Sequence, residues 1–196
     1  MEIVIATNNE DKVKEYKEIL KELNAKIYSL KELNINDDPE ETGTTFSENS
    51  LIKAKAISKY TDKIIIADDS GLVIDALPDL LGVFSKRFMG ANATYYQKNT
   101  EVIRLLEGKE RTARFICCLT VLNLTDESLQ FTGICEGSIG YEIKGENGFG
   151  FDPIFIPLNY KMSISEVSDE EKNRISHRGL ACQKFINYLK ENKVGI

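Results

Sequence analysis

The segment Ile64–Gly71 constrains the fold more than any other part of the sequence, because it is an apolar run of strand length that leads directly into two carboxylates. Its three consecutive isoleucines are β-branched and suit a strand covered on both faces, as in the parallel sheets of α/β proteins. We expect Asp68 and Asp69 at the carboxyl end of this strand, where open α/β sheets bind ligands. Side chains alternate along a strand, so only one aspartate can face a given cleft. Capping of a turn by the pair is the alternative.

Periodicity elsewhere predicts an α/β protein with a mixed sheet. Further strands are expected at 3–7, 25–30, 114–124 and 129–136, and the last two suggest an antiparallel hairpin. Helices are expected near 13–23, 45–60, 94–106 and 180–189, where apolar residues recur at helical spacing. Thr45 and Glu48 have the spacing of a capping box. We therefore expect a mixed, twisted sheet flanked by helices, with a cleft between a larger and a smaller lobe, in a single domain over 1–196.

Composition argues against several classes of protein. The formal net charge of −6 disfavours a nucleic-acid partner, because phosphate backbones are bound by basic surfaces. The amino-terminal residues turn polar too early for a signal peptide, and the uncharged run Phe115–Thr125 is too short to span a bilayer. We therefore expect a cytoplasmic protein with no membrane contact. The cysteines include no C-x-x-C pair and are expected to be buried free thiols.

The first predicted strand breaks into the polar turn Asn8–Lys12, which precedes a helix. A helix N-terminus presents N–H groups and a partial positive charge, and Lys12 adds a cation, so this turn can hold a phosphate. It is not a Walker loop, because that sequence occurs nowhere in the chain. A surface turn capped by Asn9 or Asp11 is the alternative.

A second informative segment is Gly145–Pro153, in which glycines are interleaved with two aromatics and an acid. Glycine permits close approach of the backbone, and Phe149 and Phe151 can stack on a planar ring. The order of the glycines does not match the dinucleotide fingerprint, which disfavours a Rossmann cofactor site. A hairpin whose aromatics fill the core is the alternative.

His177 is the only histidine in the chain, and we expect it in the first turn of the last helix, with Ser176 as N-cap. A structural role for this histidine stays open beside a role in binding. Neighbouring side chains on a helix diverge, so Ser176 and His177 do not form a nucleophile and base pair. A serine hydrolase is therefore not indicated.

Four motifs in order resemble the inosine triphosphate pyrophosphatase family: Thr7-x-Asn9-x-x-Lys12, Ala67-Asp68-Asp69-Ser70-Gly71, Phe149-Gly150-Phe151-Asp152-Pro153 and Ser176-His177-Arg178. The resemblance extends from the first strand to the last helix. It implies a homodimeric α/β enzyme that uses Mg²⁺ to hydrolyse ITP, dITP and XTP to the monophosphate and pyrophosphate. Such an enzyme removes non-standard purine nucleotides from the nucleotide pool.

The resemblance also implies roles for individual residues. Asp69 is implied as proton acceptor and metal ligand, and Glu40 as the second metal carboxylate, although Glu41 is only one position away. The implied contacts to base and phosphates are Thr7, Asn8, Asn9, Glu10, Asp11, Lys12, Lys53, Ser70, Phe149, Gly150, Phe151, Asp152, Lys172, His177 and Arg178. The lysines of this set can offset the charge of a triphosphate, and carboxylates suit a hard Mg²⁺ ion.

Two positions depart from the usual family pattern, with Leu81 in place of proline and Lys86 in place of alanine. Both bear on a loop and on the expected dimer contact, but not on the implied reaction. Two other functions stay open: a Maf-type pyrimidine nucleotide pyrophosphatase, and a non-enzymatic module that binds Mg²⁺ and phosphate. The aromatic loop and Ser176–Arg178 speak against the Maf-type enzyme.

Overall fold

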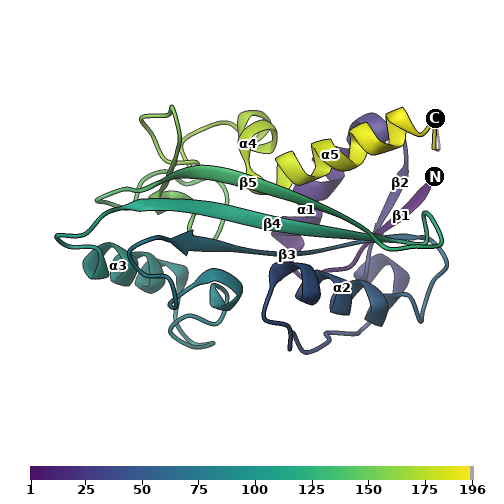
Figure 1. The fold of residues 1–196 in the computed structure, drawn as a ribbon, viewed down its shortest axis with the longest axis horizontal. Helices are drawn as coiled ribbons and strands as arrows, with labels where there is room; N and C mark the ends of the chain where they lie inside the picture. Colours follow the sequence, from purple (N-terminus) through teal and green to yellow (C-terminus); the bar gives the residue numbers. More distant parts are fainter. Residues whose placement is uncertain (195–196) are drawn as a thin grey trace. The chain divides into compact units, whose positions relative to one another are not determined.

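The structure is a computed structural model of the chain and describes residues 1–194. Its elements are, in chain order, β1 (Glu2–Ile5), α1 (Glu10–Ile19), η1 (Leu20–Leu23), β2 (Lys26–Ser29), η2 (Lys31–Leu33), α2 (Phe46–Ile57), β3 (Ile64–Ile74), η3 (Gly82–Phe84), α3 (Tyr95–Leu105), β4 (Thr112–Leu122), β5 (Leu129–Ile139), η4 (Asp152–Ile154), β6 (Phe155–Pro157), α4 (Asp169–Ile175) and α5 (His177–Glu191) (Figure 1).

The chain divides into two compact units, which we describe separately. Unit 1 comprises Met1–Asp69, Cys117–Gly133 and the described part of Arg178–Ile196, and unit 2 comprises Ser70–Ile116 and Ile134–His177. The long strands β3, β4 and β5 contribute residues to both units. All the strands named above belong to one 6-stranded sheet in the order β2-β1-β3-β4-β5-β6.

The sheet is mixed, as the sequence predicted. Strand β1 pairs in parallel with both β2 and β3, and the register with β3 places Ile3 beside Ile64 and Ile5 beside Ile66. Strand β5 pairs antiparallel with β6. The predicted hairpin is formed by β4 and β5, which are neighbours in the sheet. The fold is therefore an α/β fold with a parallel part in unit 1.

Both faces of the sheet in unit 1 are covered by helices. One face buries Ile3, Ile5 and Ile66 with the apolar residues of α1 and α5, and the other buries Ile65 and residues of α2 (Figure 1). Burial on both faces explains why the isoleucines of β3 run consecutively instead of alternating with polar residues.

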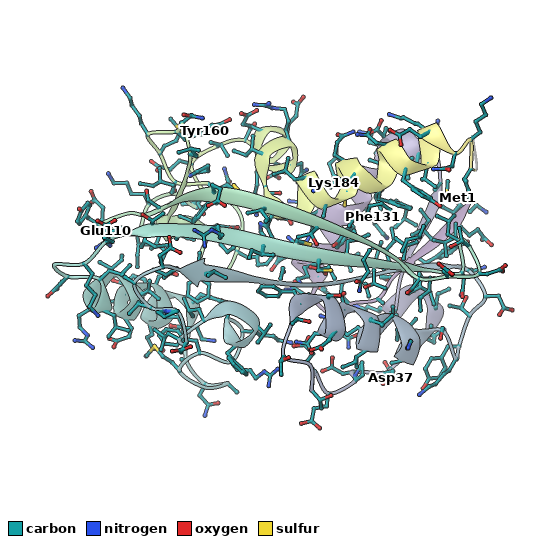
Figure 2. The ribbon with its side chains drawn as sticks, viewed as in Figure 1. Met1, Asp37, Glu110, Phe131, Tyr160 and Lys184 are labelled. Carbon is teal, nitrogen blue, oxygen red and sulfur yellow. The ribbon has the colours of Figure 1, made fainter. Side chains whose placement is uncertain are left out.

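The packing of α5 on the sheet is visible around Phe131 and Lys184 (Figure 2). The ring of Phe131 lies 5.7 Å from that of Phe185, and the ammonium of Lys184 donates to the carbonyl of Thr132 at 2.6 Å. The amphipathic carboxyl-terminal segment predicted from the sequence thus packs through its apolar residues, while its lysine reaches the edge of β5.

Strand β3 corrects one expectation from the sequence. It does not end at Asp68 and Asp69 but continues to Ile74. Asp, Ser and Gly are poor strand formers, so local strand propensity predicts that β3 ends there. The strands on either side of β3 in the sheet nevertheless keep its backbone extended. The strand that does end here is β1, whose last pair with β3 is Ile5 with Ile66. The two aspartates therefore lie just beyond the carboxyl end of β1.

The core of unit 2 gathers apolar residues from β3, α3, β4 and β5. Leu81 belongs to this core and is only 2% exposed. Lys86, the other unusual position, accepts a hydrogen bond at its carbonyl from Lys98 Nζ at 2.7 Å. Both departures from the family pattern are thus accommodated within unit 2.

Several local signals act as the sequence predicted. Thr45 and Glu48 form the capping box that starts α2, and Thr94 and Gln97 form a second one that starts α3. Cys117, Cys118, Cys135 and Cys182 are all buried free thiols. Within residues 1–194, no helix is both long enough and apolar enough to cross a bilayer.

Candidate active site around Asp68 and Asp69

The turn between β1 and α1 is organised by Asn9. Its side-chain Oδ1 accepts from the backbone N–H of Asp11 at 2.9 Å and of Lys12 at 3.2 Å, and its own N–H donates to Thr7 Oγ1 at 3.2 Å. The alternative of a capped turn is therefore correct for Asn9. Because two N–H groups of the first turn are already bonded, a phosphate here would depend on side chains, above all on Lys12.

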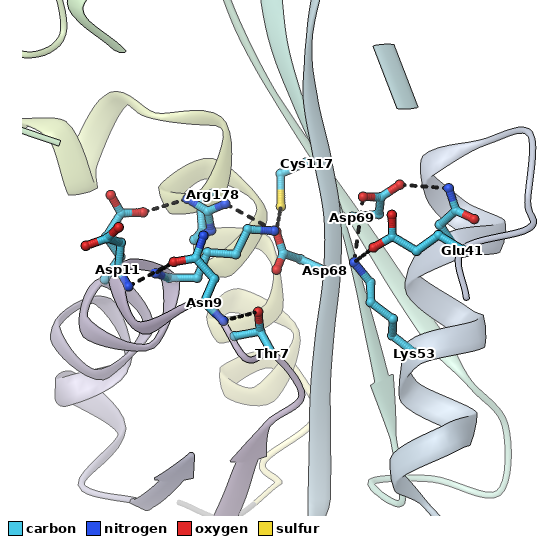
Figure 3. Close-up of polar contacts among 12 residues, drawn as sticks. Thr7, Asn9, Asp11, Glu41, Lys53, Asp68, Asp69, Cys117 and Arg178 are labelled. Atoms are coloured by element: carbon cyan, nitrogen blue, oxygen red, sulfur yellow. Dashed lines mark hydrogen bonds and ion pairs between the residues drawn. The ribbon is translucent and has the colours of Figure 1, made fainter. Parts of the chain in front are cut away.

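Asp68 binds two cations through one oxygen. Its Oδ2 lies 2.9 Å from Lys12 Nζ and 3.2 Å from Arg178 Nη2, and Cys117 Sγ lies 3.8 Å from the same atom (Figure 3). Its other oxygen, Oδ1, is buried and has no hydrogen-bond partner among residues 1–194. Burial alone would raise the pKa of Asp68, but Lys12 and Arg178, with Lys53, hold it well below its usual range. Asp68 is therefore a permanently ionised anchor.

Asp69 faces α2 on the other side of the strand (Figure 3). Asn49 Nδ2 donates to its Oδ2 at 3.0 Å, and Lys53 Nζ lies 3.6 Å from its Oδ1. Burial raises the pKa of Asp69 above its usual value, against the opposing charge of Lys53 and the hydrogen bond from Asn49. This carboxylate is thus a stronger base than an exposed aspartate.

Lys53 links Asp69 to Glu41. Its ammonium lies 2.9 Å from Glu41 Oε1, and burial, which would lower its pKa, is outweighed by Asp68, Asp69 and Glu41, so that its pKa is raised. Glu40, the expected metal carboxylate, is exposed, whereas Glu41 belongs to this group of charges. The carboxylates of Glu41 and Asp69 thus share one lysine.

The carboxylates of this group suit a divalent cation only in part. No group of three or more His, Cys, Asp or Glu side chains in the described part of the chain is close enough to hold a metal ion. Two carboxylates nevertheless match the way Mg²⁺ binds in nucleotide enzymes, where phosphate oxygens and water complete its coordination. The donor chemistry therefore fits Mg²⁺ bound together with a triphosphate.

In unit 2, the glycine-rich segment is tied to Lys172 through Asp152. The Oδ2 atom of Asp152 accepts from the N–H of Phe149 at 2.8 Å and from Lys172 Nζ at 2.7 Å. A Cβ at Gly148, which has a φ of 76°, would lie 2.3 Å from the same oxygen, so this close approach requires glycine. The Asp152 and Lys172 side chains are 5% and 4% exposed, respectively, and form a buried ion pair.

The two aromatics of this segment have different surroundings, and the alternative that the aromatics fill the core holds for Phe151. Phe151 is 4% exposed, belongs to the core and packs edge-on against Tyr95 at 5.6 Å. Phe149 is only half-buried, and the ammonium of Lys172 lies 4.9 Å from its ring centroid. Phe149 is therefore the more exposed of the two rings in this loop.

His177 is buried and stacks on Phe115, with ring centroids 4.7 Å apart and planes 15° from parallel. Arg178, the next residue, is 1% exposed. Its Nη1 donates to Glu15 at 2.6 Å in addition to the bond from Nη2 to Asp68. Ser70, on β3, is half-buried. The predicted role of each of these residues toward a substrate stays a prediction.

The structure thus joins Lys12, Asp68 and Arg178 in one group within unit 1, and Asp69 and Lys53 in another. In unit 2 it joins Phe149, Asp152 and Lys172 in a third group. The remaining predicted contacts in the turn, Asn8, Glu10 and Asp11, are exposed.

Sequence reasoning did not single out Glu15 or Asn49. A signal for both existed, because Glu15 follows Lys12 by three residues and Asn49 precedes Lys53 by four, and residues at these spacings share one face of a helix. Asn49 bonds Asp69, which also lies beside Lys53, and Glu15 bonds Arg178, which shares Asp68 with Lys12.

Comparison with known proteins identifies close relatives. A model of the Ham1 family matches residues 3–188. The dITP/XTP pyrophosphatase of Thermoanaerobacter pseudethanolicus is 44% identical over 192 residues, and that of Bacillus subtilis is 43% identical over 191 residues; each alignment covers 96% of both proteins.

Solved structures of similar chains agree with the fold. A HAM1 protein from Coxiella burnetii has a TM-score of 0.86 at 40% identity, covering 97% of this chain and 99% of the other. The Staphylococcus aureus Ham1 protein has a TM-score of 0.85 at 35% identity, covering 98% of this chain and 100% of the other. The similarity therefore includes nearly the whole chain.

Proposed function

The chain belongs to the Ham1 family, and from this membership and the charges around Asp69 we propose that it hydrolyses dITP, XTP and ITP to the monophosphate and pyrophosphate. Relatives named dITP/XTP pyrophosphatase support this substrate class. One observation carries the proposal: Asp69, a buried carboxylate of raised pKa, lies beside Lys53 and directly follows Asp68, which holds Lys12. A base and two cations that can bind phosphate thus lie at or beside two adjacent residues of β3, Asp68 and Asp69.

The residues of unit 1 account for the chemistry at phosphorus. Hydrolysis of a phosphoanhydride needs neutralised phosphate oxygens and a group that takes a proton from the attacking water. Lys12 and Lys53 supply cations, and the turn at Thr7 and Asn9 binds the phosphate chain. Asp69 accepts the proton, and its raised pKa makes it the better base of the two aspartates.

We propose Mg²⁺ as the cofactor. Asp69 would hold it together with Glu41, which shares Lys53 with Asp69, or with Glu40 as the resemblance implies. When bound, the ion supplies positive charge to the phosphate oxygens as negative charge develops on them. The two carboxylates beside Lys53 support this assignment, because Mg²⁺ prefers oxygen ligands.

The residues of unit 2 are proposed to recognise the base. The ring of Phe149 stacks on the purine, and Lys172 and Asp152 fix the loop that carries it. Hypoxanthine and xanthine have a 6-oxo acceptor where adenine has an amino donor, so a donor from His177 would select against ATP. A donor left unpaired by the wrong base costs about 1–3 kcal/mol, or on the order of 10–100-fold in rate.

We further propose that the protein acts as a cytoplasmic homodimer. We also propose that the two units form a single functional domain and that the protein has no nucleic-acid or membrane partner. The net charge of −6 supports the absence of a nucleic-acid partner. Light scattering measured as the protein elutes from a size-exclusion column would test the dimer, because a mass near 22.1 kDa would identify a monomer.

The proposed reaction is tested by incubating the purified protein and Mg²⁺ with equal concentrations of dITP, XTP, ATP, GTP and CTP. Pyrophosphate and orthophosphate are measured separately, and the nucleotide product is identified by chromatography. We expect pyrophosphate and the monophosphate, with kcat/KM for dITP and XTP at least about 100-fold above the others. Asp69→Asn protein, prepared identically, controls for contaminating phosphatases.

Two results would contradict the proposal. Release of orthophosphate with a diphosphate product would place the cleavage at the wrong phosphorus. Equal kcat/KM for GTP and dITP would leave a general triphosphate pyrophosphatase instead of a base-selective one.

A further inference from the structure

Unit 2 contains a cavity whose lining residues differ from those of the candidate active site. Its volume is about 470 Å³, and sites for small molecules commonly have about 300–1,000 Å³. Its walls come from the turn before β4, the end of β5 and the segments on either side of β6. Glu110, in the turn before β4, is labelled in Figure 2. All of these segments belong to unit 2, so one compact unit forms the cavity.

Arg111 places a fixed positive charge at this cavity. Its Nε donates to the carbonyl of Ile139 at 2.7 Å, its Nη1 to that of Leu106 at 3.2 Å, and its Nη2 to that of Gly140. These acceptors are neutral, and within residues 1–194 no carboxylate forms an ion pair with this guanidinium. The backbone therefore holds Arg111 in place without neutralising its charge.

Tyr141 covers this guanidinium and presents a flat surface to solvent. Its ring centroid lies 4.3 Å from Arg111 Cζ, a distance typical of a cation over an aromatic face. The residue is nevertheless 81% exposed. Because Arg111 takes one face of the ring, the other face is open to a second planar group. A ring that is already held by a neighbour also loses little freedom when a ligand stacks on it.

Further cations line the cavity. Lys109 and Lys161 are exposed, and neither forms an ion pair with another residue of the described chain. Lys144 is paired with Glu142 at 2.9 Å. The lining has four cationic and three acidic side chains, which is an excess of one positive charge in a chain whose net charge is −6. The cavity therefore favours an anion more than the rest of the surface does.

The lining also has apolar side chains, among them Ile156 and Met162, which is 45% exposed. Sites for small molecules combine such apolar area with a few polar groups that orient the ligand. An inorganic anion would use only the cations of this lining. A flat aromatic ring with a negative group would use the cations, the apolar area and Tyr141 together.

We propose that this cavity binds a small aromatic anion, whose flat ring stacks on the open face of Tyr141 and whose carboxylate or phosphate group is bound by the cations of the lining. This site goes beyond the proposed hydrolysis, because its residues differ from those of the groups around Asp68, Asp69 and Asp152. Its occupation does not depend on which nucleotide the protein hydrolyses.

Isothermal titration calorimetry without Mg²⁺ or nucleotide tests the proposal with two naphthyl anions, 2-naphthoate and 2-naphthyl phosphate. Two matched probes separate the contributions. The neutral 2-naphthamide keeps the flat ring without the charge, and cyclohexanecarboxylate keeps the charge without the flat ring. We expect saturable binding of at least one naphthyl anion, with a Kd at least about fivefold below that of either matched probe. Which naphthyl anion binds more tightly identifies the negative group that the site accepts.

Tyr141→Ala should raise the Kd of the tighter naphthyl anion at least about fivefold, because stacking on the ring is lost. Tyr96→Ala is the matched control, since Tyr96 lies on α3 in the same unit and is 70% exposed. It should leave the Kd within about twofold. Arg111 is left unchanged, because its bonds to three carbonyls support the fold.

The double variant Lys109→Gln with Lys161→Gln tests the charge. It should raise the same Kd at least about threefold, whereas Lys55→Gln with Lys59→Gln, at exposed lysines of unit 1, should leave it within about twofold. Each of these changes replaces an exposed side chain, so the variants are expected to fold, and thermal unfolding checks that they do.

Three results would overturn the proposal. The first is the absence of saturable binding of both naphthyl anions. The second is an equal Kd for the tighter naphthyl anion and either matched probe, since the site would then select only a ring or only a charge. The third is an unchanged Kd in Tyr141→Ala, which would place the ligand elsewhere on the protein. The proposed hydrolysis is measured separately, and its failure would leave this proposal standing.

Discussion

Asp68 and Asp69 are adjacent in β3, yet their carboxylates bond different cations: Asp68 Oδ2 lies 2.9 Å from Lys12, and Asp69 Oδ1 lies 3.6 Å from Lys53. The two environments shift their pKa values in opposite directions, downward for Asp68 and upward for Asp69. Carboxylates whose pKa values are pushed apart take different roles in many active sites. Here the pair separates an electrostatic anchor from a candidate base.

Asp68→Asn is expected to cost stability more than chemistry. The amide would leave Lys12 and Arg178 buried together without their shared carboxylate, and breaking a buried ion pair costs about 3–5 kcal/mol. Urea unfolding at pH 7 measures the loss. Asp75→Asn is the control, since Asp75 is 44% exposed beside Arg114 and should cost at most about 1 kcal/mol.

The cost of Asp68→Asn should also depend on pH. The folded pKa of Asp68 is depressed, so its stabilisation is fully present above the unfolded pKa of about 3.9 and is lost as the pH falls through the folded value. The difference in unfolding free energy between wild type and variant should therefore be constant from neutral pH down to about pH 4 and shrink below it. A difference that shrinks already between pH 7 and pH 5 would assign the effect to another group.

Asp69→Asn should abolish turnover without lowering stability. The amide can neither accept the proton nor bind Mg²⁺ well, so we expect kcat to fall at least about 100-fold while nucleotide binding persists. The folded pKa of Asp69 is raised above its unfolded value, so ionisation of Asp69 costs folding stability as the pH rises through the unfolded pKa, and the full cost is present above the folded pKa. At pH 7 without Mg²⁺ the variant should have a Tm equal to or above the wild type. A clear drop in Tm would mean that ionised Asp69 supports the fold.

Glu41→Gln should weaken Mg²⁺ dependence more than Glu40→Gln. Glu41 shares Lys53 with Asp69, whereas Glu40 is exposed. Loss of even an outer partner of a metal ligand costs about 10–100-fold in affinity, so the Mg²⁺ concentration for half-maximal activity should rise at least about tenfold in Glu41→Gln. Calorimetric titration of Mg²⁺ into the protein with a bound nucleotide checks the same order. If Glu40→Gln weakens Mg²⁺ binding more than Glu41→Gln does, Glu40 is the metal ligand instead.

Lys12→Ala should raise KM for dITP and also destabilise the protein. The side chain of Lys12 is only 15% exposed and is bonded to Asp68. Removing a hydrogen bond to a charged group costs about 1–3 kcal/mol, so we expect a measurable loss in unfolding free energy as well as a KM at least about tenfold higher. Lys21→Ala, at a lysine 76% exposed, should change neither. An unchanged KM in Lys12→Ala would leave Lys12 with the anchor role alone.

The sequence by itself determined the elements whose causes are local. Consecutive isoleucines predicted a strand buried on both faces, and capping residues predicted the start of α2. Alternation along the strand implied that Asp68 and Asp69 face different sides, and the ordered motifs pointed to the family. These signals succeed because strand period, helix period and caps depend on neighbours within a few residues.

Only the tertiary structure decided which charges meet. Asp68 is separated by 56 residues from Lys12 and by 110 from Arg178, and Arg178 is 163 residues from Glu15. No local pattern encodes such pairs, so neither the anchor role of Asp68 nor the position of Glu15 followed from the sequence. The same reason explains β3, which local propensity ends at the aspartates and which pairing with its neighbours in the sheet extends to Ile74.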